Sequence, residues 1–234
     1  MSGLKPHWLF AELDEDELAD LAAVAVRRSV EDGVMLFRRG DPTPGLHVVE
    51  QGAIKIYRLT REGEERIIDI IGPGECCGEM GVVDGAPSAA WGQAMGLTRL
   101  WVLPAPAFER LLLTHPHMCL KLCRVLVGKL RAANQQLEET FFLSSRERVL
   151  RRLVRLAERH GRPAPGGGVT LAVRLTHVEI ARHAGTARET VTRVLAELQD
   201  LGLLRFEGRY MCFADMARLR TLAGVVTNEP IEGL

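Results

Sequence analysis

The sequence lacks any uninterrupted apolar run of about 20 residues, the length that a membrane-spanning helix needs. Residues 1–10 also lack the basic flank and the apolar stretch of a secretory signal peptide. The five cysteines are odd in number and follow no regular spacing, which argues against a disulfide framework. We therefore expect a cytoplasmic protein with reduced thiols and no membrane partner.

The signatures of the common enzyme classes are also missing. The sequence has no Walker-type glycine loop, no His-Glu-x-x-His zinc helix and no Gly-x-Ser-x-Gly nucleophile elbow. The glycine run at residues 166–168 follows no predicted strand and precedes no predicted helix, so we interpret it as a flexible loop. We therefore expect a protein that is not an enzyme.

The charges of the two halves have opposite sign. Residues 1–140 carry 15 basic and 20 acidic side chains, whereas residues 141–234 carry 15 basic and 10 acidic ones. Every basic residue after 140, histidine aside, is arginine, whose planar donor fork matches phosphates and base edges. An acidic half joined to an arginine-rich half indicates that the second half meets a polyanion.

Residues 30–103 alternate short apolar runs with breaks that contain glycine or proline. The runs lie at residues 34–37, 46–49, 53–57, 67–71 and 100–103. Breaks between them include residues 50–52 and 72–74. Many short strands at this spacing are typical of an antiparallel barrel or sandwich. A helix over residues 13–26, which begins at Asp14, precedes them.

From residue 106 to about residue 142 the apolar spacing becomes helical, and Pro116 suits the first position of a helix. Residues with small or apolar side chains recur there every three or four positions: Cys119, Leu122, Leu126, Leu130, Ala133 and Leu137. A seam of about five turns suits a partner helix better than a small local core. We therefore predict a homodimer held by this seam, with polar residues such as Lys129 and Arg131 in solvent.

Two capping boxes follow in the second half, one from Thr176 to Glu179 and one from Thr186 to Glu189. Gly185 separates the two short helices that they would begin. A short helix, a tight turn and a second helix form a helix-turn-helix, and residues 203–213 would add a hairpin as its wing. The second half therefore reads as a DNA-binding domain.

The exposed beginning of the second of these helices would enter the major groove. The side chains predicted to reach base edges there are Arg188, Glu189, Thr192 and Arg193. Arginine can bond guanine and glutamate can accept from cytosine, so this set would read G·C pairs. Thr176 and Thr186, together with the helix amides, would hold phosphates. The alternative is that Glu189 only caps its helix and the arginines are solvated.

Taken in order, several motifs resemble a known family along nearly the whole chain. Residues 36–41 and 52–57 resemble the opening strands of a cyclic-nucleotide-binding barrel, and residues 78–81 resemble the start of its phosphate-binding cassette. Residues 188–193 resemble a recognition helix that reads a TGTGA half-site. The chain thus resembles the cyclic-AMP receptor protein and fumarate-nitrate reductase regulator (CRP/FNR) family.

The resemblance implies an α+β fold with four parts. These are a sensor domain with a jelly-roll β-barrel at 1–107, a dimerisation helix at 108–143, a winged helix-turn-helix at 144–223 and a tail at 224–234. It also implies a homodimeric transcription regulator that binds double-stranded DNA at a TGTGA-like palindrome. The loop at 159–169 lies where activators of the family touch RNA polymerase.

The cyclic-AMP site of the family is incomplete in this sequence. Ser88 and Ala89 stand where the family has the Arg-Ser pair that grips the cyclic phosphate, and Ala133 and Asn134 stand where it has hydroxyl residues. Arg99 and Arg131 are the nearest basic alternatives by sequence. We therefore expect an unknown small effector other than cyclic AMP, or none. The predicted effector pocket is formed by Gly78, Glu79, Met80, Gly81, Ser88, Ala89 and Asn134.

Alternatives from other sensor classes stay open. A haem- or thiol-based sensor of the same family could use His7, His47, Cys76, Cys77 or Met80, although none has diagnostic spacing. His115, Cys119 and Cys123 share a helix face, but packing explains them better than a metal does, so we assign no metal site. The cofactor stays unknown. A further alternative is a ligand-binding signalling subunit that acts on a protein partner.

Overall fold

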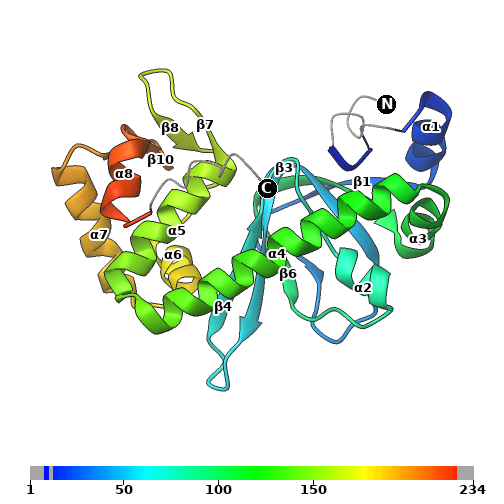
Figure 1. Ribbon diagram of the computed structural model, residues 1–234, viewed down its shortest axis with the longest axis horizontal. Coiled ribbons are helices and arrows are strands. Elements are labelled where there is room, and N and C mark those ends of the chain that lie inside the picture. Colours follow the sequence, from blue (N-terminus) through cyan, green and yellow to red (C-terminus); the bar gives the residue numbers. More distant parts are fainter. Residues whose placement is uncertain (1–7, 11–12, 226–234) are drawn as a thin grey trace, which may run out of the picture. The chain divides into compact units, whose positions relative to one another are not determined.

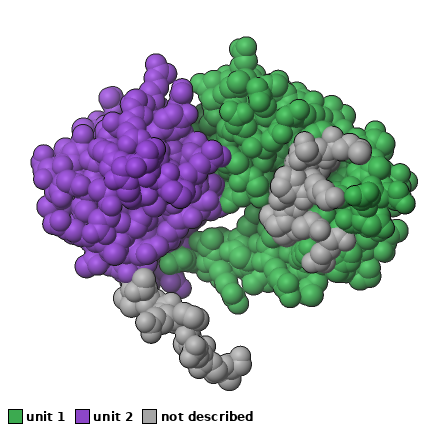
Figure 2. Space-filling model, turned by 90° about the horizontal axis from the view of Figure 1, so that it is seen from above, with its two compact units in different colours: residues 1–135 green, residues 136–234 purple. Residues whose placement is uncertain are grey.

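The computed structural model describes residues 8–10 and 13–225, and the chain divides into two compact units, residues 1–135 and 136–234. Figure 2 colours the two units separately. The division falls inside one long helix, α4 (Pro116–Phe142), which contributes residues to both units. Each unit has its own sheet and its own buried core.

Unit 1 combines one sheet with several helices (Figure 1). A 3-10 turn (Trp8–Phe10) comes first, followed by α1 (Glu15–Val24), which Asp14 and Glu17 begin with a capping box. The strands are β1 (Val26–Val30), β2 (Met35–Phe37), β3 (Gly45–Leu59), β4 (Glu65–Ile71), β5 (Cys76–Cys77) and β6 (Trp91–Pro104). Between β5 and β6 lies α2 (Glu79–Asp84), and α3 (Ala105–Thr114) leads into α4.

Two long strands organise the sheet. β3 and β6 pair antiparallel from Gly45 with Pro104 to Tyr57 with Trp91, and the strand order is β1-β6-β3-β4. The short strands attach at opposite ends of the long pair. β5 joins β3 at His47 and Val48, whereas β4 joins β3 from Ile54 onward. The long pair of β3 and β6 therefore has different neighbouring strands at its two ends, as in a rolled sheet.

The predicted break at residues 50–52 is wrong, because these residues continue β3 as an irregular segment. The pairing with β6 shifts register around Gln51 without interruption of the strand. Gly52 has a φ of +80°, and a Cβ atom there would lie 2.6 Å from the Leu97 carbonyl oxygen. Glycine therefore marks a close approach between two backbones, not the end of a strand.

The alternating side chains of β3 face two different cores. Leu46 and Val48 belong to a cluster with Phe108 of α3 and with Met118 and Leu122 of α4. The next cluster contains Val49, Ile54, Ile71 and Cys77 and is made by the strands themselves. The first cluster holds α3 and the start of α4 against the sheet, because the apolar side chains of all three elements are buried together there.

Unit 2 combines four helices with a small sheet. The helices are α5 (Ser145–His160), α6 (His177–Ala184), α7 (Arg188–Asp200) and the short C-terminal α8 (Met216–Leu222). The strands β7 (Gly161–Pro163), β8 (Val169–Leu171), β10 (Tyr210–Phe213) and β9 (Leu204–Glu207) follow one another across the sheet in this order. Helix, turn, helix and hairpin thus occur as predicted, and the predicted α+β class is confirmed.

The capping prediction is confirmed at one helix and wrong at the next. Thr176 and Glu179 form the predicted box at the start of α6. At α7 the N-cap is Ala187, which has no side-chain hydrogen bond, so Thr186 does not cap the helix. The Thr186 amide instead donates to the Ala181 carbonyl, 3.0 Å away, and closes the end of α6. Thr186, which the sequence pattern assigned to the N-cap of α7, is therefore part of the turn that ends α6.

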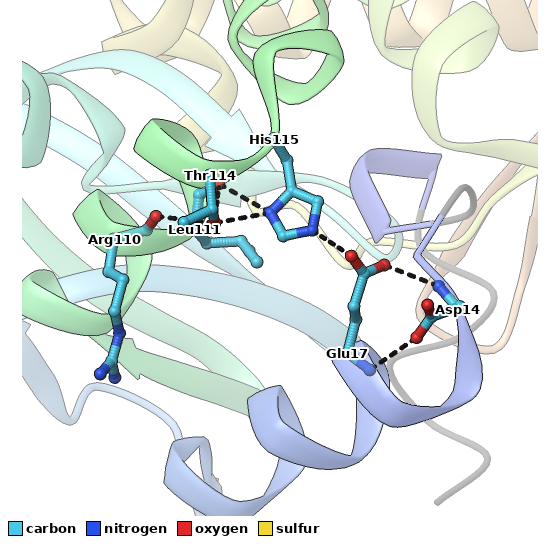
Figure 3. A network of polar contacts seen from close by, with 6 residues as sticks. All are labelled: Asp14, Glu17, Arg110, Leu111, Thr114 and His115. Carbon is cyan, nitrogen blue, oxygen red and sulfur yellow. Dashed lines mark hydrogen bonds and ion pairs between the residues drawn. The ribbon is translucent and has the colours of Figure 1, made fainter.

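A polar network joins α1 to the junction of α3 and α4 (Figure 3). The Glu17 carboxylate pairs with His115 Nε2 and accepts from the Asp14 amide at 2.9 Å. On its other side, His115 Nδ1 lies 2.8 Å from Thr114 Oγ1 and 3.1 Å from the Leu111 carbonyl. The hydrogen bond to Glu17 raises the pKa of His115 above its ordinary value, and the same bond lowers the pKa of Glu17.

This pair predicts a pH-dependent contribution to stability. The raised pKa of His115 gives stability that is full below its ordinary value of 6.5 and is lost as pH rises through the folded-state pKa. The lowered pKa of Glu17 gives stability that is full above 4.5 and is lost as pH falls through the folded-state pKa. Glu17→Gln should therefore lower the urea-unfolding midpoint most between pH 4.5 and 6.5. Asp20→Asn, which removes a charge from the exposed face of the same helix, is the control and should show no such window. An equal loss for Glu17→Gln at every pH would contradict the ion pair.

Candidate functional site

One candidate site lies at the exposed face of α7. Val191, Val194 and Leu195 turn inward and are buried, so the opposite face of the helix is left to solvent. All four side chains predicted to read bases are exposed on it, namely Arg188, Glu189, Thr192 and Arg193. Within the described part of the chain none of the three charged ones forms an ion pair. The fold therefore presents two cations and one carboxylate at the beginning of a helix.

Arg148 of α5 fixes the turn that precedes α7. Its Nε and Nη2 atoms donate to the carbonyls of Ala184 and Gly185, each at 3.1 Å, and Nη1 donates to the Leu143 carbonyl at 2.9 Å. Gly185 has a φ of +62°, a left-handed conformation that glycine adopts at little cost. The sequence analysis assigned no role to Arg148, whereas its side chain satisfies carbonyls that the turn leaves without partners.

His177 is a residue of this face that the sequence analysis missed. It is the first residue of α6, and its Nδ1 atom lies 2.9 Å from Thr192 Oγ1 on α7. Thr192 Oγ1 also donates to the Arg188 carbonyl at 3.1 Å. Thr176, predicted to hold a phosphate, is exposed beside His177, while Thr186 is only partly exposed in the turn. No sequence signal pairs His177 with Thr192, because the two residues belong to different helices.

The wing is the hairpin of β9 and β10. Gly208 at its tip has a φ of +62°, and the neighbouring Arg209 is exposed. Arg205 is instead occupied by Glu207, with 2.9 Å between Nη2 and Oε1. Arg209 is therefore the wing cation that is better placed to meet an anion.

A second candidate site surrounds the beginning of α2 in unit 1. Gly78 has a φ of +94°, and a Cβ atom there would collide with the Gly45 carbonyl oxygen. A Cβ atom at Gly81 would collide with Thr43. Of the two residues that these glycines flank, Glu79 is only 2% exposed whereas Met80 is 57% exposed. The segment thus points one carboxylate inward and leaves the methionine outside.

Lys129 of α4 binds this buried carboxylate, which contradicts the prediction that Lys129 is solvated. Its Nζ atom lies 2.6 Å from Glu79 Oε1 and donates to the Cys76 carbonyl at 3.3 Å. Burial lowers the pKa of Lys129, but the nearby Glu79 carboxylate more than offsets this, so the pKa lies above its ordinary value. The second oxygen, Glu79 Oε2, is buried and has no hydrogen-bond partner among the described residues.

The rest of the predicted pocket is only partly assembled in one chain. Ser88 and Ala89 contribute mainly backbone: the Ser88 amide donates to the Asp41 carbonyl at 2.9 Å, and the Ala89 carbonyl accepts from Arg58 Nε at 3.1 Å. Arg58 is thus a cation at this segment that the sequence analysis missed in favour of Arg99 and Arg131. Asn134 is exposed on α4, roughly 140° around the helix axis from Lys129.

The predicted seam along α4 is wrong in its details, because α4 presents two faces. Leu122 is 4% exposed and lies in the first core of unit 1, and Leu126 packs against the same core. A different set of residues is exposed on the other side and is called the outer stripe: Leu120, Cys123, Val127, Leu130, Asn134, Leu137 and Phe141. Of the predicted seam only Leu130 and Leu137 belong to it. Cys119 and Ala133 are exposed beside it.

The thiols of Cys76 and Cys77 are poorly suited to redox or metal chemistry. Burial raises the pKa of Cys76 to about 12 and raises that of Cys77 well above its ordinary value. His47, which pairs with Cys77 in the sheet, has its pKa lowered to about 4 by burial. In the described ranges no group of three or more His, Cys, Asp or Glu side chains could hold a metal ion. His7, a candidate haem ligand, lies outside the described residues.

Comparison with known proteins identifies both units. The family of the cyclic nucleotide-binding domain matches residues 27–115, and that of the Crp-like helix-turn-helix domain matches residues 147–222. The CRP-like cAMP-activated global transcriptional regulator of Mycobacterium tuberculosis is 31% identical over 187 residues, which cover 80% of this chain and 83% of that protein. The chain belongs to the CRP/FNR family. It is therefore a transcription regulator with a DNA-binding domain and not an enzyme.

A second relative supports the CRP/FNR assignment, and a solved structure shares the fold. The Cyclic AMP receptor protein of Thermus thermophilus is 31% identical over 197 residues, which cover 84% of this chain and 88% of that one. The structure of FixK2 from Bradyrhizobium japonicum shares the fold with a TM-score of 0.76 at 24% identity, over 85% of this chain and 97% of that one. No helix in the described ranges is long and apolar enough to span a membrane.

The burial of the cysteines predicts a two-class alkylation pattern for this CRP/FNR protein. Cys119 and Cys123 are exposed, whereas Cys76, Cys77 and Cys212 are buried. With iodoacetamide at neutral pH, the thiol of Cys119, which lies beside the outer stripe, should react at least about tenfold faster than the three buried thiols, since only accessible thiolate reacts. Mass spectrometry of tryptic peptides with and without urea would measure this. Fast reaction of Cys76 or Cys77 in the folded protein would restore a thiol sensor in unit 1.

Proposed function

We propose that this protein is a homodimeric regulator that reads a palindrome with TGTGA-like half-sites through α7. The observation that carries the proposal is the exposed set of Arg188, Glu189 and Arg193 on a helix whose opposite face is buried. Arginine bonds guanine O6 and N7 with two donors, and glutamate accepts from the amino group of cytosine. These pairings favour a half-site with two or more G·C pairs.

The residues around α7 would orient it on the DNA backbone. Thr176 and His177 stand at the N-terminus of α6, where backbone amides also favour phosphate oxygens. Arg209 at the tip of the wing would reach a phosphate further along the duplex. The exposed hairpin of β7 and β8 would be the surface that meets RNA polymerase. In this proposal the sensor domain covers residues 1–107, the dimerisation helix 108–143, the DNA-binding domain 144–223 and a tail 224–234.

Dimerisation is assigned to the outer stripe of α4. A monomer would expose five large apolar side chains along one face of this helix, with Leu130 61% and Phe141 73% accessible. Exposed apolar patches of this kind typically mark an interface. A second copy would cover the stripe and would supply the second DNA-binding domain that a palindrome needs.

The effector is proposed to be a small molecule other than cyclic AMP, or to be dispensable. The family relatives at 31% identity are named for their response to cyclic AMP, but here Ser88 and Ala89 replace the Arg-Ser pair of the resemblance. The cations that do lie near the segment are already engaged, Lys129 with Glu79 and Arg58 with the Ala89 carbonyl. A cyclic phosphate buried there without a dedicated cation would be costly.

DNA recognition by α7 can be tested with one substitution at a time. Arg188→Ala should weaken binding to a TGTGA palindrome by about 1–3 kcal/mol and relax the preference at a single base pair. Arg209→Ala is the matched control in the wing: it should weaken all sequences alike and reduce the salt slope by about one. Shift assays on a palindrome with single base changes, at several salt concentrations, give both quantities. A uniform loss for Arg188→Ala would assign that arginine to a phosphate instead.

The effector proposal predicts that cyclic AMP does not switch the protein. Titration calorimetry should show no binding at micromolar nucleotide, and the affinity for the palindrome should stay the same when cyclic AMP is added. Micromolar binding that also strengthens DNA binding would overturn this. In that case Arg58→Ala and Lys129→Met would show which cation holds the phosphate, because only the responsible one should abolish binding.

A further inference from the structure

Thr192 lies in the middle of the exposed face of α7. Arg188 stands one helical turn before it and Arg193 directly after it, and all three side chains are exposed. Of the four residues predicted to read bases, Thr192 is the one without a charge. Its hydroxyl group contacts His177 of α6, the first helix of the motif. What Thr192 presents to a base therefore depends on how this hydroxyl group is held.

The hydroxyl group of Thr192 has two partners within the chain. Its Oγ1 atom donates to the Arg188 carbonyl oxygen at 3.1 Å. A hydroxyl group has a single proton, so the imidazole must be the donor in the contact of 2.9 Å between Oγ1 and His177 Nδ1. Thr192 therefore has no proton left for an oxygen or nitrogen acceptor of a base. The Cγ2 methyl group is the part of this exposed side chain that no hydrogen bond uses.

His177 selects one of the two conformations that a helix allows to threonine. In either of two χ1 rotamers the hydroxyl group can reach a carbonyl of the preceding turn, so the backbone of α7 does not choose between them. The donor at His177 Nδ1 favours the rotamer in which Oγ1 lies toward α6. The capping box of Thr176 and Glu179 fixes the beginning of α6, where His177 is the first residue. The position of the methyl group on α7 is therefore set from the neighbouring helix.

We propose that His177 is a positioning residue for DNA recognition, which holds the Thr192 hydroxyl group so that the Cγ2 methyl group contacts the 5-methyl group of one thymine in each half-site. The inference rests on the proposed reading of DNA by α7 and adds a base that the charged residues of the helix do not recognise. Thymine carries its methyl group in the major groove, where a threonine methyl group is a suitable apolar partner.

The place of Thr192 between two arginines matches the proposed half-site. In TGTGA a thymine stands directly before each guanine. An arginine that binds one of these guanines therefore has a thymine methyl group beside it, and Arg188 and Arg193 both flank Thr192 on the exposed face. Contact between the two methyl groups removes apolar surface from water and stabilises the complex without a further hydrogen bond.

The test replaces thymine by deoxyuridine, which pairs with adenine in the same way but lacks the methyl group. Counted over both strands, a TGTGA half-site contains three thymines, and each is replaced in turn in both half-sites of the palindrome. Shift assays with the full-length protein give the ratio of the two dissociation constants for each replacement. One of the three replacements should weaken binding by the wild type about tenfold, because the contact of one methyl group is lost in each half-site.

Two variants of Thr192 assign this effect to its methyl group. Thr192→Ser keeps the hydroxyl group and both of its partners but has no methyl group. It should therefore bind the thymine and the deoxyuridine palindrome equally, within about twofold. Thr192→Val, the matched control, keeps a methyl group and has no hydroxyl group, so it should retain the difference of about tenfold.

Two variants of His177 test the positioning. His177→Ala removes the donor, so both rotamers of Thr192 become populated and the ratio should fall to about threefold or less. His177→Asn has an amide donor at a similar distance from the backbone as Nδ1 and should restore the wild-type ratio. Both variants lack the imidazole ring, so any contact of that ring with a phosphate cancels in the comparison. A ratio measured on one folded variant is also independent of its stability.

The outcomes separate this inference from the proposed function. Specific binding of the palindrome without an effect of any deoxyuridine would overturn the methyl contact and leave the proposed function standing. A tenfold effect that persists in Thr192→Ser would assign the thymine to another side chain. An unchanged ratio in His177→Ala would overturn the role of His177. Equal binding of the palindrome and of unrelated DNA would overturn the proposed function and the inference together.

Discussion

The structure depends most on the division of α4 into two faces. On one face Met118 and Leu122 are buried in a cluster with Leu46, Val48 and Phe108. The burial of these apolar side chains holds the helix against the sheet of unit 1. On the other face a row of apolar side chains stays exposed. One helix of 27 residues thus completes the core of its own chain and presents a surface for another. A shift in the sequence spacing between the two faces would disrupt both the core contacts of α4 and its exposed apolar surface.

The ion pair between Glu79 and Lys129 links this helix to the candidate effector site. A buried carboxylate is tolerated only where a cation or donors compensate it, and α4 supplies that cation. The segment from Gly78 to Gly81 can approach its neighbours closely because its glycines have no Cβ atoms. A ligand that bound Glu79 Oε2 would therefore lie next to the ion pair that ties α4 to this segment.

In the DNA-binding unit, the exposed and the partly buried arginines have different tasks. Arg148 donates to three carbonyls and sets the turn before α7, while Arg155 contacts the buried Glu139 at the end of α4. These contacts fix the helices relative to one another within the unit. Arg188 and Arg193 can then remain exposed on a rigid element, which is what direct reading of bases requires.

The sequence by itself determined the elements and most of their order. The Thr176 capping box, the helix start at Pro116 and the exposed residues of α7 follow from local spacing, because they depend on neighbours within one or two turns. Only the tertiary structure decided which face of α4 is outward, that Lys129 meets Glu79, and that Thr186 closes α6 rather than capping α7. The physical reason is the same in each case. Helical spacing groups residues on a face, but the core against which the helix packs decides where that face points.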